Sequence, residues 1–164
     1  MPEEIFDVVN ERDEVIGQAP RSQVHARKLL HRAIHIFVFT SRGELLLQKR
    51  SEFKDEYPLK FTSSASGHLS AGETYDEAAP RELREELGIA VPLVRLQKFP
   101  AGPETSFEHT VLYRADCDLP LKIDPAEVAE LVEWPIAEVQ RRVAAEPDEF
   151  CPAFRVLFDW FCRM

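Results

Sequence analysis

Three carboxylates in the middle of the sequence are spaced so that one helix face would hold all of them. They are Glu82, Glu85 and Glu86, and positions i, i+3 and i+4 of a helix point the same way. Like charges at this spacing destabilise an isolated helix. Two interpretations are open. The carboxylates form a solvated acidic face with Arg81 and Arg84 as partners, or they converge on a divalent cation, because Mg²⁺ prefers oxygen ligands.

The residues around these carboxylates follow a longer pattern. The segment GHLSAGETYDEAAPRELREELGI fits G-x5-E-x7-R-E-U-x-E-E-x-G-U, where U is a bulky aliphatic residue. Random sequence of average composition would match this pattern about once in 10⁹ starts. The matching residues are Gly67, Glu73, Arg81, Glu82, Leu83, Glu85, Glu86, Gly88 and Ile89. This pattern is the Nudix box, so the chain resembles the Nudix hydrolase superfamily, and the match favours the cation-binding interpretation.

The resemblance implies a set of metal ligands. In Nudix proteins the box forms a loop, a helix and a second loop that bind Mg²⁺ or Mn²⁺, and the enzymes hydrolyse a diphosphate linked to another chemical group. By this resemblance Glu82, Glu85 and Glu86 are metal ligands, and the backbone carbonyl of Ser66 completes the coordination. One of the glutamates, often at the position of Glu82, also polarises the attacking water. Mg²⁺ or Mn²⁺ is therefore the expected cofactor.

Two other residues belong to the catalytic set that the resemblance implies. Arg81 would form a salt bridge with Glu73 that holds the helix against the preceding loop. Glu108 precedes the strand TVLYRAD, where Nudix proteins often supply a further metal-binding or catalytic glutamate. Sheet edges also favour charge, so an ordinary carboxylate at a strand edge is the other interpretation of Glu108. We count Arg81 and Glu108, with Glu82 and Glu85, as the candidate catalytic residues.

Outside the box the chain is similar to one branch of the superfamily, the type 1 isopentenyl-diphosphate isomerases. The similarity covers the segment HRAIHIFVFTSRGELLLQKRSEFKDEYPLKFTSSASGHLSAGE. The residues that fall on the isomerase pattern are Arg50, Lys54, Pro58, Thr62, Gly67 and His68. By this resemblance Arg50 and Lys54 contact the substrate phosphate, although cations that follow a strand are also often simply exposed.

Ser66 departs from the isomerase pattern, because the isomerases carry their catalytic cysteine at this position. A hydroxyl is a much weaker acid than a thiol, so it is a poor substitute for a group that moves protons to and from carbon. The departure favours hydrolysis over isomerisation.

The histidines leave a further question open. The isomerases bind a metal through histidines and glutamates, and the residues near the matching positions here are His25, His31, His68 and Glu108. The first two are one residue closer together than in the isomerase pattern. A second, His-rich metal site is thus open, beside the interpretation of each histidine as an ordinary hydrogen-bonded residue. We favour the ordinary role for His25, His35 and His109.

The composition limits the kind of protein. With 164 residues, of which 45% are hydrophobic and 30% charged, residues 1–164 are expected to form a single Nudix domain. The formal charge of -9 disfavours a nucleic acid polymer as partner, since such binding needs a basic surface. The apolar runs are short and the first residues are acidic, so we expect no membrane span, no secretory signal and a cytoplasmic location. Three cysteines without C-x-x-C spacing indicate buried or idle thiols. The sequence leaves monomer and homodimer equally open.

Strand and helix signals alternate along the chain, which predicts an α/β fold, the Nudix α/β/α sandwich with a mixed β-sheet. Thr74 and Glu77 have the form of a capping box and Gly88 is placed as a stop, so a helix is expected at about 75–87, kinked at Pro80. Strands are expected at 5–9, 31–40, 44–50, 59–66, 93–99, 108–116 and 130–134, a short helix or turn at 20–25, and helices at 136–145 and 152–162.

The sequence therefore predicts a Mg²⁺-dependent hydrolase that cleaves the diphosphate of a small molecule, of the nucleoside diphosphate type or another organic diphosphate. An isopentenyl-diphosphate isomerase is the first alternative. The second is a module that binds a nucleotide or diphosphate without turnover, although an intact box argues against it. No motif in the loops outside the box identifies the group attached to the diphosphate.

Overall fold

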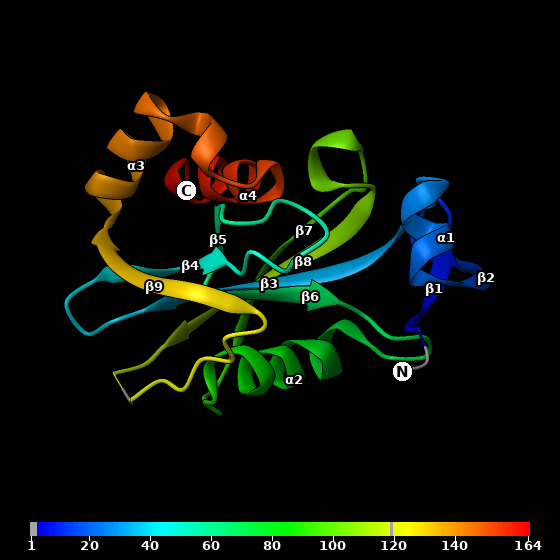
Figure 1. Cartoon of the computed structure of the whole chain (residues 1–164), viewed down its shortest axis with the longest axis horizontal. Coiled ribbons are helices and arrows are strands. Elements are labelled where there is room, and N and C mark those ends of the chain that lie inside the picture. The colour runs from blue at the N-terminus through cyan, green and yellow to red at the C-terminus, as the bar shows by residue number, and fades with distance from the viewer. Residues whose placement is uncertain (1–2, 119) are drawn as a thin grey trace.

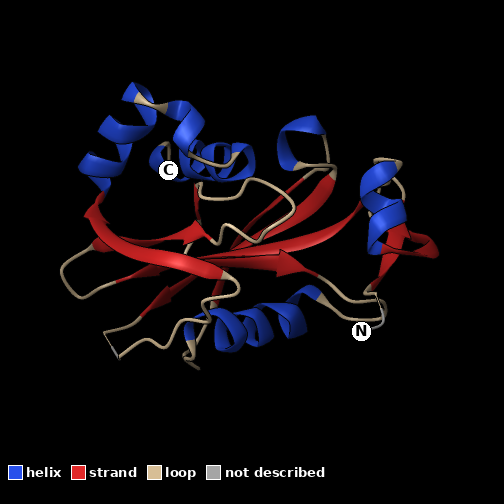
Figure 2. Ribbon diagram, viewed as in Figure 1, coloured by secondary structure: helices blue, strands red, loops and turns tan. Residues whose placement is uncertain are grey.

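The computed structural model describes residues 3–118 and 120–164, and within them the strands form a seven-stranded mixed sheet and a two-stranded sheet (Figure 2). The strands of the larger sheet are β3 (His31–Phe39), β4 (Glu44–Arg50), β5 (Phe61–Thr62), β6 (Ala65–His68), β7 (Val94–Phe99), β8 (Glu108–Asp116) and β9 (Val128–Pro135). The smaller sheet pairs β1 (Ile5–Val9) with β2 (Val15–Pro20).

Helices cover both faces of the larger sheet, which confirms the predicted α/β/α sandwich (Figure 1). One face carries α2 (Tyr75–Leu87), and the other carries α3 (Ile136–Ala145) and α4 (Pro152–Cys162). The β1–β2 hairpin and α1 (Arg21–Ala26) lie together at one end of the sheet. Short 3-10 helices, η1 (Pro103–Thr105) and η2 (Pro147–Glu149), precede β8 and α4. In the described part of the chain, no helix is long and apolar enough to cross a membrane.

The larger sheet divides around β3, and this division makes room for a site. On one side β3 pairs in parallel with β8 along its whole length. On the other side its first half pairs with β6, and only its last residues pair with β4. Beyond these residues β4 pairs with β5, and its other edge pairs with β9 along the whole strand. Ser64 lies at the division, where its hydroxyl donates to the carbonyl of Leu46 on β4 and accepts from the N–H of Val38 on β3.

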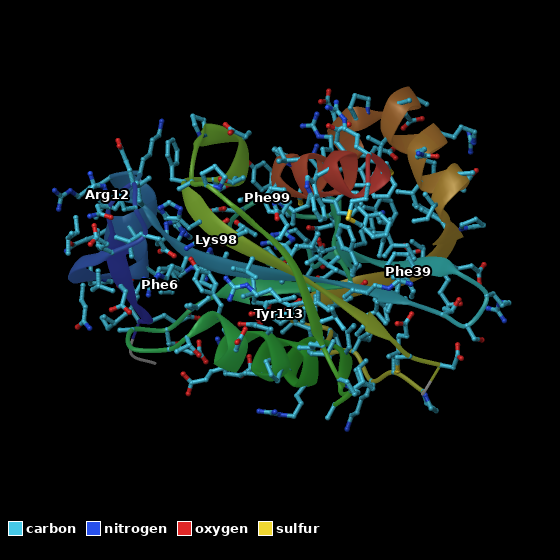
Figure 3. All side chains as sticks on the ribbon, turned by 180° about the vertical axis from the view of Figure 1, so that it is seen from behind. Phe6, Arg12, Phe39, Lys98, Phe99 and Tyr113 are labelled. Atoms are coloured by element: carbon cyan, nitrogen blue, oxygen red, sulfur yellow. The ribbon has the colours of Figure 1, made fainter. Side chains whose placement is uncertain are left out.

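Alternation along the strands directs side chains into two cores. On β3, Ile34 and Ile36 pack toward α2, whereas Phe37 packs toward α4. Figure 3 shows the same division farther along the sheet, with Phe99 on the side of α4 and Tyr113 on the side of α2. The helical spacing of Phe154, Leu157, Phe158 and Phe161 predicts core packing. The first three are buried, and Phe161 is partly buried and packs against the same cluster, which confirms the prediction.

The differences from the predicted elements have local causes. The expected strand at 59–66 is two short strands, β5 and β6, because its halves pair with different partners, β4 and β3. β2 is not evident in the sequence, since its segment VIGQAP contains glycine and proline, which weaken strand signals. Its pairing with β1 makes it a strand.

α2 begins and ends at the predicted residues. The Thr74 side chain accepts from the N–H of Glu77, and the Glu77 carboxylate accepts from the N–H of Thr74, which confirms the capping box. Gly88 ends the helix with φ of 68°, a left-handed conformation that favours glycine. The helix continues across Pro80, and the kink expected there stays a prediction.

Candidate active site

A cavity of about 550 Å³ opens beside β6, at the division of the sheet. It is lined by α2, by the strand ends of β4, β6 and β8, and by the loop that follows β4. The candidate site residues among its lining are Arg50, Lys54, Ser66, Arg81, Glu82, Glu85, Glu86 and Glu108. The structure therefore brings the proposed catalytic residues, the proposed ligands of the Mg²⁺ site and the proposed phosphate-binding residues into one cavity.

Glu86 is the most buried of the three box glutamates, with 4% of the residue exposed. Its Oε1 accepts a hydrogen bond from Gln48 Nε2 at 2.5 Å, and its Oε2 accepts one from the N–H of Ser66 at 3.2 Å. Burial raises the pKa of Glu86 well above its ordinary value, and the neighbouring charge of Glu82 raises it further. Ionisation of this pair is therefore unfavourable until a cation lies close by.

Glu82 lies against the backbone of Gly67. A Cβ atom added to Gly67 would lie 2.2 Å from the Cδ of Glu82, so only glycine leaves room for this carboxylate. Burial raises the pKa of Glu82 as well. The box glycine thus has a direct role, because it lets a helix carboxylate approach the backbone of β6.

Arg81 holds the acidic cluster in place. It forms two hydrogen bonds to Glu73, at 2.7 and 2.8 Å, which confirms the predicted salt bridge. Its Nη1 also donates to Glu82 at 2.8 Å and to Glu85 at 3.1 Å, and its Nη2 donates to the carbonyl of His68 at 3.1 Å. The hydrogen bonds to Glu73 raise the pKa of Arg81. One fixed positive charge therefore organises three carboxylates and the end of β6.

Basic residues form another part of the lining. The Nε of Arg50 donates to the carbonyl of Glu56 at 3.0 Å, and Lys54 forms an ion pair with Glu127. Arg21 lines the cavity too and pairs with Asp55. A phosphate that bound to Lys54 would therefore compete with a carboxylate of the protein.

Three histidines from distant parts of the sequence meet beside the cavity, where His68 lines it and His25 and His31 line a neighbouring cavity of about 280 Å³. His25, His31 and His68 each offer a ring nitrogen, and these atoms lie within 4.8 Å of one another. The Nδ1 of His25 lies 3.0 Å from a carboxylate oxygen of Glu56, and that of His31 lies 2.9 Å from the carbonyl of Leu29. Since these oxygens accept, each Nδ1 carries a proton, and Nε2 is the nitrogen left to bind a metal. Within the described residues, neither Nε2 has a hydrogen-bond partner. His25, for which we favoured an ordinary role, thus belongs to a cluster that could hold a metal.

Glu108 completes the histidine cluster. Its Oε2 lies 2.7 Å from Nε2 of His68 and 3.5 Å from Nε2 of His31. Although burial alone would raise it, the two histidines hold the pKa of Glu108 below its ordinary value. The residue is 7% exposed and lies on a strand with neighbours on both sides, so it is not a carboxylate at a sheet edge.

Gln48 is a site residue that the sequence analysis missed. It is buried and donates to Ser64 O at 3.1 Å as well as to Glu86, so it fixes the carboxylate from the sheet side. The sequence did contain a sign of this role. Gln48 is a polar residue two positions after Leu46, so it faces the same core as that apolar residue.

The arrangement fits a hard divalent cation. Glu82, Glu85 and Glu86 supply the oxygen donors that Mg²⁺ and Mn²⁺ accept. Glu86 is buried and Glu82 is partly buried. Burial raises the pKa of both, and the charge of Glu82 raises that of Glu86 further, so both favour a nearby cation. The histidine cluster offers nitrogen donors instead, which suit a transition metal.

Comparison with known proteins agrees with this geometry. The NUDIX domain family matches residues 29–154. An uncharacterized Nudix hydrolase of Yersinia pestis is 36% identical over 98% of this chain and 87% of its own length. A prenyl-diphosphate phosphatase of Methanosarcina mazei is 34% identical over 87% of this chain and 86% of its own. An isopentenyl-diphosphate Delta-isomerase 2 of Photorhabdus laumondii is 30% identical over 96% and 92%.

A solved structure shows the same fold. The crystal structure of the protein DR0079 from Deinococcus radiodurans superposes with a TM-score of 0.78 at 31% sequence identity, and covers 87% of this chain and 90% of that one. The sequence match, the relatives and the shared fold lead to one conclusion. The chain belongs to the Nudix family, in a branch with isopentenyl-diphosphate isomerase-like relatives, and it is a diphosphate hydrolase.

Proposed function

We propose that this chain is a Mg²⁺- or Mn²⁺-dependent Nudix hydrolase that cleaves the diphosphate of a small organic molecule. One observation carries the proposal. Glu82, Glu85 and Glu86 converge with the buried end of β6 in a cavity whose lining also holds basic residues. An acidic group that needs a cation therefore faces groups that attract phosphate.

The metal ligands in this proposal are Glu82, Glu85, Glu86 and the backbone carbonyl of Ser66. A bound cation would supply positive charge to the diphosphate and would acidify a water for attack on phosphorus. Glu82, or Glu85 beside it, accepts the proton of that water. Arg81 holds both carboxylates through one Nη, so it positions the proton acceptor.

Arg50 and Lys54 are proposed to bind the substrate phosphates. Both line the cavity, and the Lys54–Glu127 pair would open when phosphate binds. Glu108 stays ionised near neutral pH, because its pKa is lowered, so it serves as a ligand or proton acceptor and not as a proton donor.

The histidine cluster is proposed to hold a second, softer metal ion. His25, His31, His68 and Glu108 supply three nitrogens and one oxygen, and the hydrogen bonds at Nδ1 of the first two orient their Nε2 atoms toward one another. This proposal rests on the resemblance to the isomerases and on the two unpartnered buried nitrogens in the described structure.

The isomerase is the second candidate function, because the histidine cluster resembles its metal site. Moving a double bond requires acid–base groups on two sides of a hydrocarbon, and Ser66 provides a hydroxyl where the isomerases have a thiol. We expect no conversion of isopentenyl diphosphate to its allylic isomer, as followed by proton NMR with Mg²⁺ present. Isomerisation at about 1 s⁻¹ or faster would contradict the hydrolase assignment.

The cavity lining guides the search for the substrate. Besides Tyr57, its apolar side chains are small, namely Ala33, Cys151 and Ala153, and charged or polar residues make up the rest. An isoprenoid tail would therefore find little apolar surface, which favours a polar group such as a nucleoside or a sugar. The test is release of phosphate from nucleoside diphosphates, dinucleotides, nucleotide sugars and isoprenoid diphosphates, with Mg²⁺ and with EDTA. Activity on none of them, or activity in EDTA, would contradict the proposal.

Residues 1–164 are proposed to act as a single Nudix domain. The family match begins at residue 29, but the β1–β2 hairpin also supports the box loop. The Asp7 carboxylate accepts from the N–H of Gly72 at 2.9 Å, and the carbonyl of Ile5 accepts from the N–H of Ala71 at 2.9 Å. The N-terminal hairpin thus shapes the loop that precedes α2.

A further inference from the structure

His35 is a buried polar residue in an apolar strand. It belongs neither to the proposed metal ligands nor to the basic residues proposed to bind phosphate. It is 5% exposed and lines the main cavity. Along β3 it follows His31 at an even spacing, so both side chains leave the same face of the sheet. Its strand partner on β6 is Ser66, beside the box. The imidazole therefore lies in the wall of the cavity, at the strand position opposite Ser66.

The hydrogen bonds of His35 indicate which nitrogen carries the proton. Nδ1 lies 2.6 Å from the hydroxyl of Ser63, which is fully buried. Within the described residues, Ser63 Oγ has no other hydrogen-bond partner, so Nδ1 is the acceptor available to its proton. A buried hydroxyl that donates to nothing would be costly. Ser63 therefore donates to Nδ1, and the proton of the neutral ring resides on Nε2.

We propose that His35 binds the substrate diphosphate through its Nε2–H, which donates to a phosphoryl oxygen, and that Ser63 fixes the tautomer that makes this possible. The inference deepens the proposed function and rests on a diphosphate occupying this cavity. It adds a neutral donor to the basic residues that the resemblance implies.

The surroundings keep this donor neutral. Burial lowers the pKa of His35 to about 4, with Glu108 acting in the opposite direction, and with Arg50 and His68 lowering it further. Glu108, Arg50 and His68 line the same cavity as His35. A neutral donor can bind an anion without weakening the nearby divalent cation site by repulsion.

A purely structural role for the Ser63–His35 pair would require the second nitrogen to be satisfied as well. His109 shows what that looks like, because its Nδ1 accepts from the N–H of Ala101 and its Nε2 donates to the carbonyl of Asn10. Among the described hydrogen bonds, none uses Nε2 of His35, although the residue lines the cavity. His109 is therefore a matched control, a buried histidine outside the cavity.

Steady-state kinetics on whichever diphosphate the wild-type protein hydrolyses test the proposal. His35→Leu removes the donor and should raise KM roughly tenfold or more, with kcat changed less than about threefold, since the bond is made equally in the ground and transition states. His35→Gln keeps an N–H at a similar reach and should restore KM to within about threefold of wild type. His109→Gln should leave both constants unchanged. A KM unchanged in His35→Leu, or not rescued by His35→Gln, would overturn the proposal.

NMR of the wild-type protein tests it without any variant that must fold. Long-range ¹H–¹⁵N spectra of the imidazoles should show His35 neutral with the proton on Nε2, and its Nε2 signal should move when methylenediphosphonate is added with Mg²⁺. If the protein hydrolyses diphosphates, two results would contradict the proposed role of His35 but leave the proposed function intact. They are the Nδ1–H tautomer of His35, and a His35 Nε2 signal that does not move when the protein is saturated with methylenediphosphonate. A protein that neither binds the diphosphonate nor hydrolyses any diphosphate contradicts the proposed function as well.

Discussion

Glu86 and Glu108 are buried glutamates in the same cavity, yet their surroundings shift the pKa in opposite directions. Burial and the charge of Glu82 raise the pKa of Glu86, whereas His31 and His68 lower that of Glu108 despite its burial. Arg81 pairs with Glu82 and Glu85, but among the described residues no basic side chain forms an ion pair with Glu86. In the histidine cluster, by contrast, Glu108 is paired with two side chains of the protein itself, His31 and His68.

This contrast suggests a division of labour. Carboxylates that repel one another are stabilised most by a cation that binds from solution. This is expected for a Mg²⁺ site that also contacts the substrate. A carboxylate paired with histidines is already stable and favours a nitrogen-coordinated metal or a fixed acceptor. The predictions below test whether the two clusters behave differently.

The largest effect is expected at Glu86. Glu86→Gln should lower Mg²⁺-dependent turnover by a factor on the order of 10³, because one ligand loses its charge. The fold should persist, since the Gln amide can donate to Glu82 while its oxygen accepts from Gln48. Phosphate release measures turnover, and Glu130→Gln, at an exposed residue of β9, is the control. Near-normal turnover in Glu86→Gln at saturating substrate would remove Glu86 from the ligand set.

Gly67→Ala tests the geometry of the box without changing any charge. The added Cβ would overlap the Glu82 carboxyl group, which can swing away because it ends a flexible side chain. We expect turnover to fall roughly 10²-fold, since small displacements of reacting groups cost about this much. Stability, measured by thermal unfolding, should change by less than about 1 kcal/mol.

Gly17→Ala is the matched control for Gly67→Ala, because an added Cβ at Gly17 meets nothing within 4 Å. It should keep full turnover. Equal loss of turnover in both variants would indicate a general effect of replacing a strand glycine and not displacement of Glu82.

The histidine cluster should show a different metal preference. With Co²⁺ as a spectroscopic probe, His31→Gln should weaken Co²⁺ binding roughly 10- to 100-fold. The Mg²⁺ concentration that supports half-maximal turnover should change less than about threefold in a protein kept saturated with Co²⁺. Absorbance titration and phosphate release give the two quantities. Unchanged Co²⁺ binding would show that the cluster is not a metal site.

The smallest effect, and the sharpest comparison, is the pH dependence of stability without metal. A raised pKa means that the folded state holds its proton more tightly, so stability from Glu86 is lost as the pH rises above the ordinary glutamate value of about 4.3. A lowered pKa has the opposite sign, so stability from Glu108 is present above that value and is lost as the pH falls below it.

In EDTA, Glu86→Gln should therefore gain Tm relative to wild type as the pH rises from about 4 to 8. Glu108→Gln should have a lower Tm than wild type at all pH values above about 4.3, and this deficit should shrink as the pH falls below that value. Differences of roughly 1 kcal/mol would shift Tm by about 2–4 °C in a protein of this size. Calorimetry from about pH 2 to 8 measures both variants, and the same pH trend in the two would contradict the contrast between the clusters.

The local parts of the fold could be predicted well because their causes are local. The capping box at Thr74 and the left-handed stop at Gly88 define α2 from a few neighbouring residues. The spacing of Phe154, Leu157 and Phe158 indicated the buried face of α4. The division of the expected strand at 59–66 into β5 and β6 could not be predicted, because the two halves pair with strands from different parts of the chain.

The sequence by itself determined the acidic half of the site. The box glutamates, Arg81 and Glu73 lie on one short segment, so helix periodicity and a salt bridge within reach are enough to bring them together. Gly67 belongs to the same segment. It has to be glycine because the Glu82 side chain of the helix in this segment packs against its backbone.

Only the tertiary structure decided the other half. Gln48 reaches Glu86 from β4. His35 and His68 reach the cavity because β3, β6 and β8 pair in one register, and a shift by a single residue would turn these side chains to the opposite face. Their charges and tautomers depend in turn on burial and on partners such as Ser63. These are properties of packing between distant segments, and a linear pattern does not contain them.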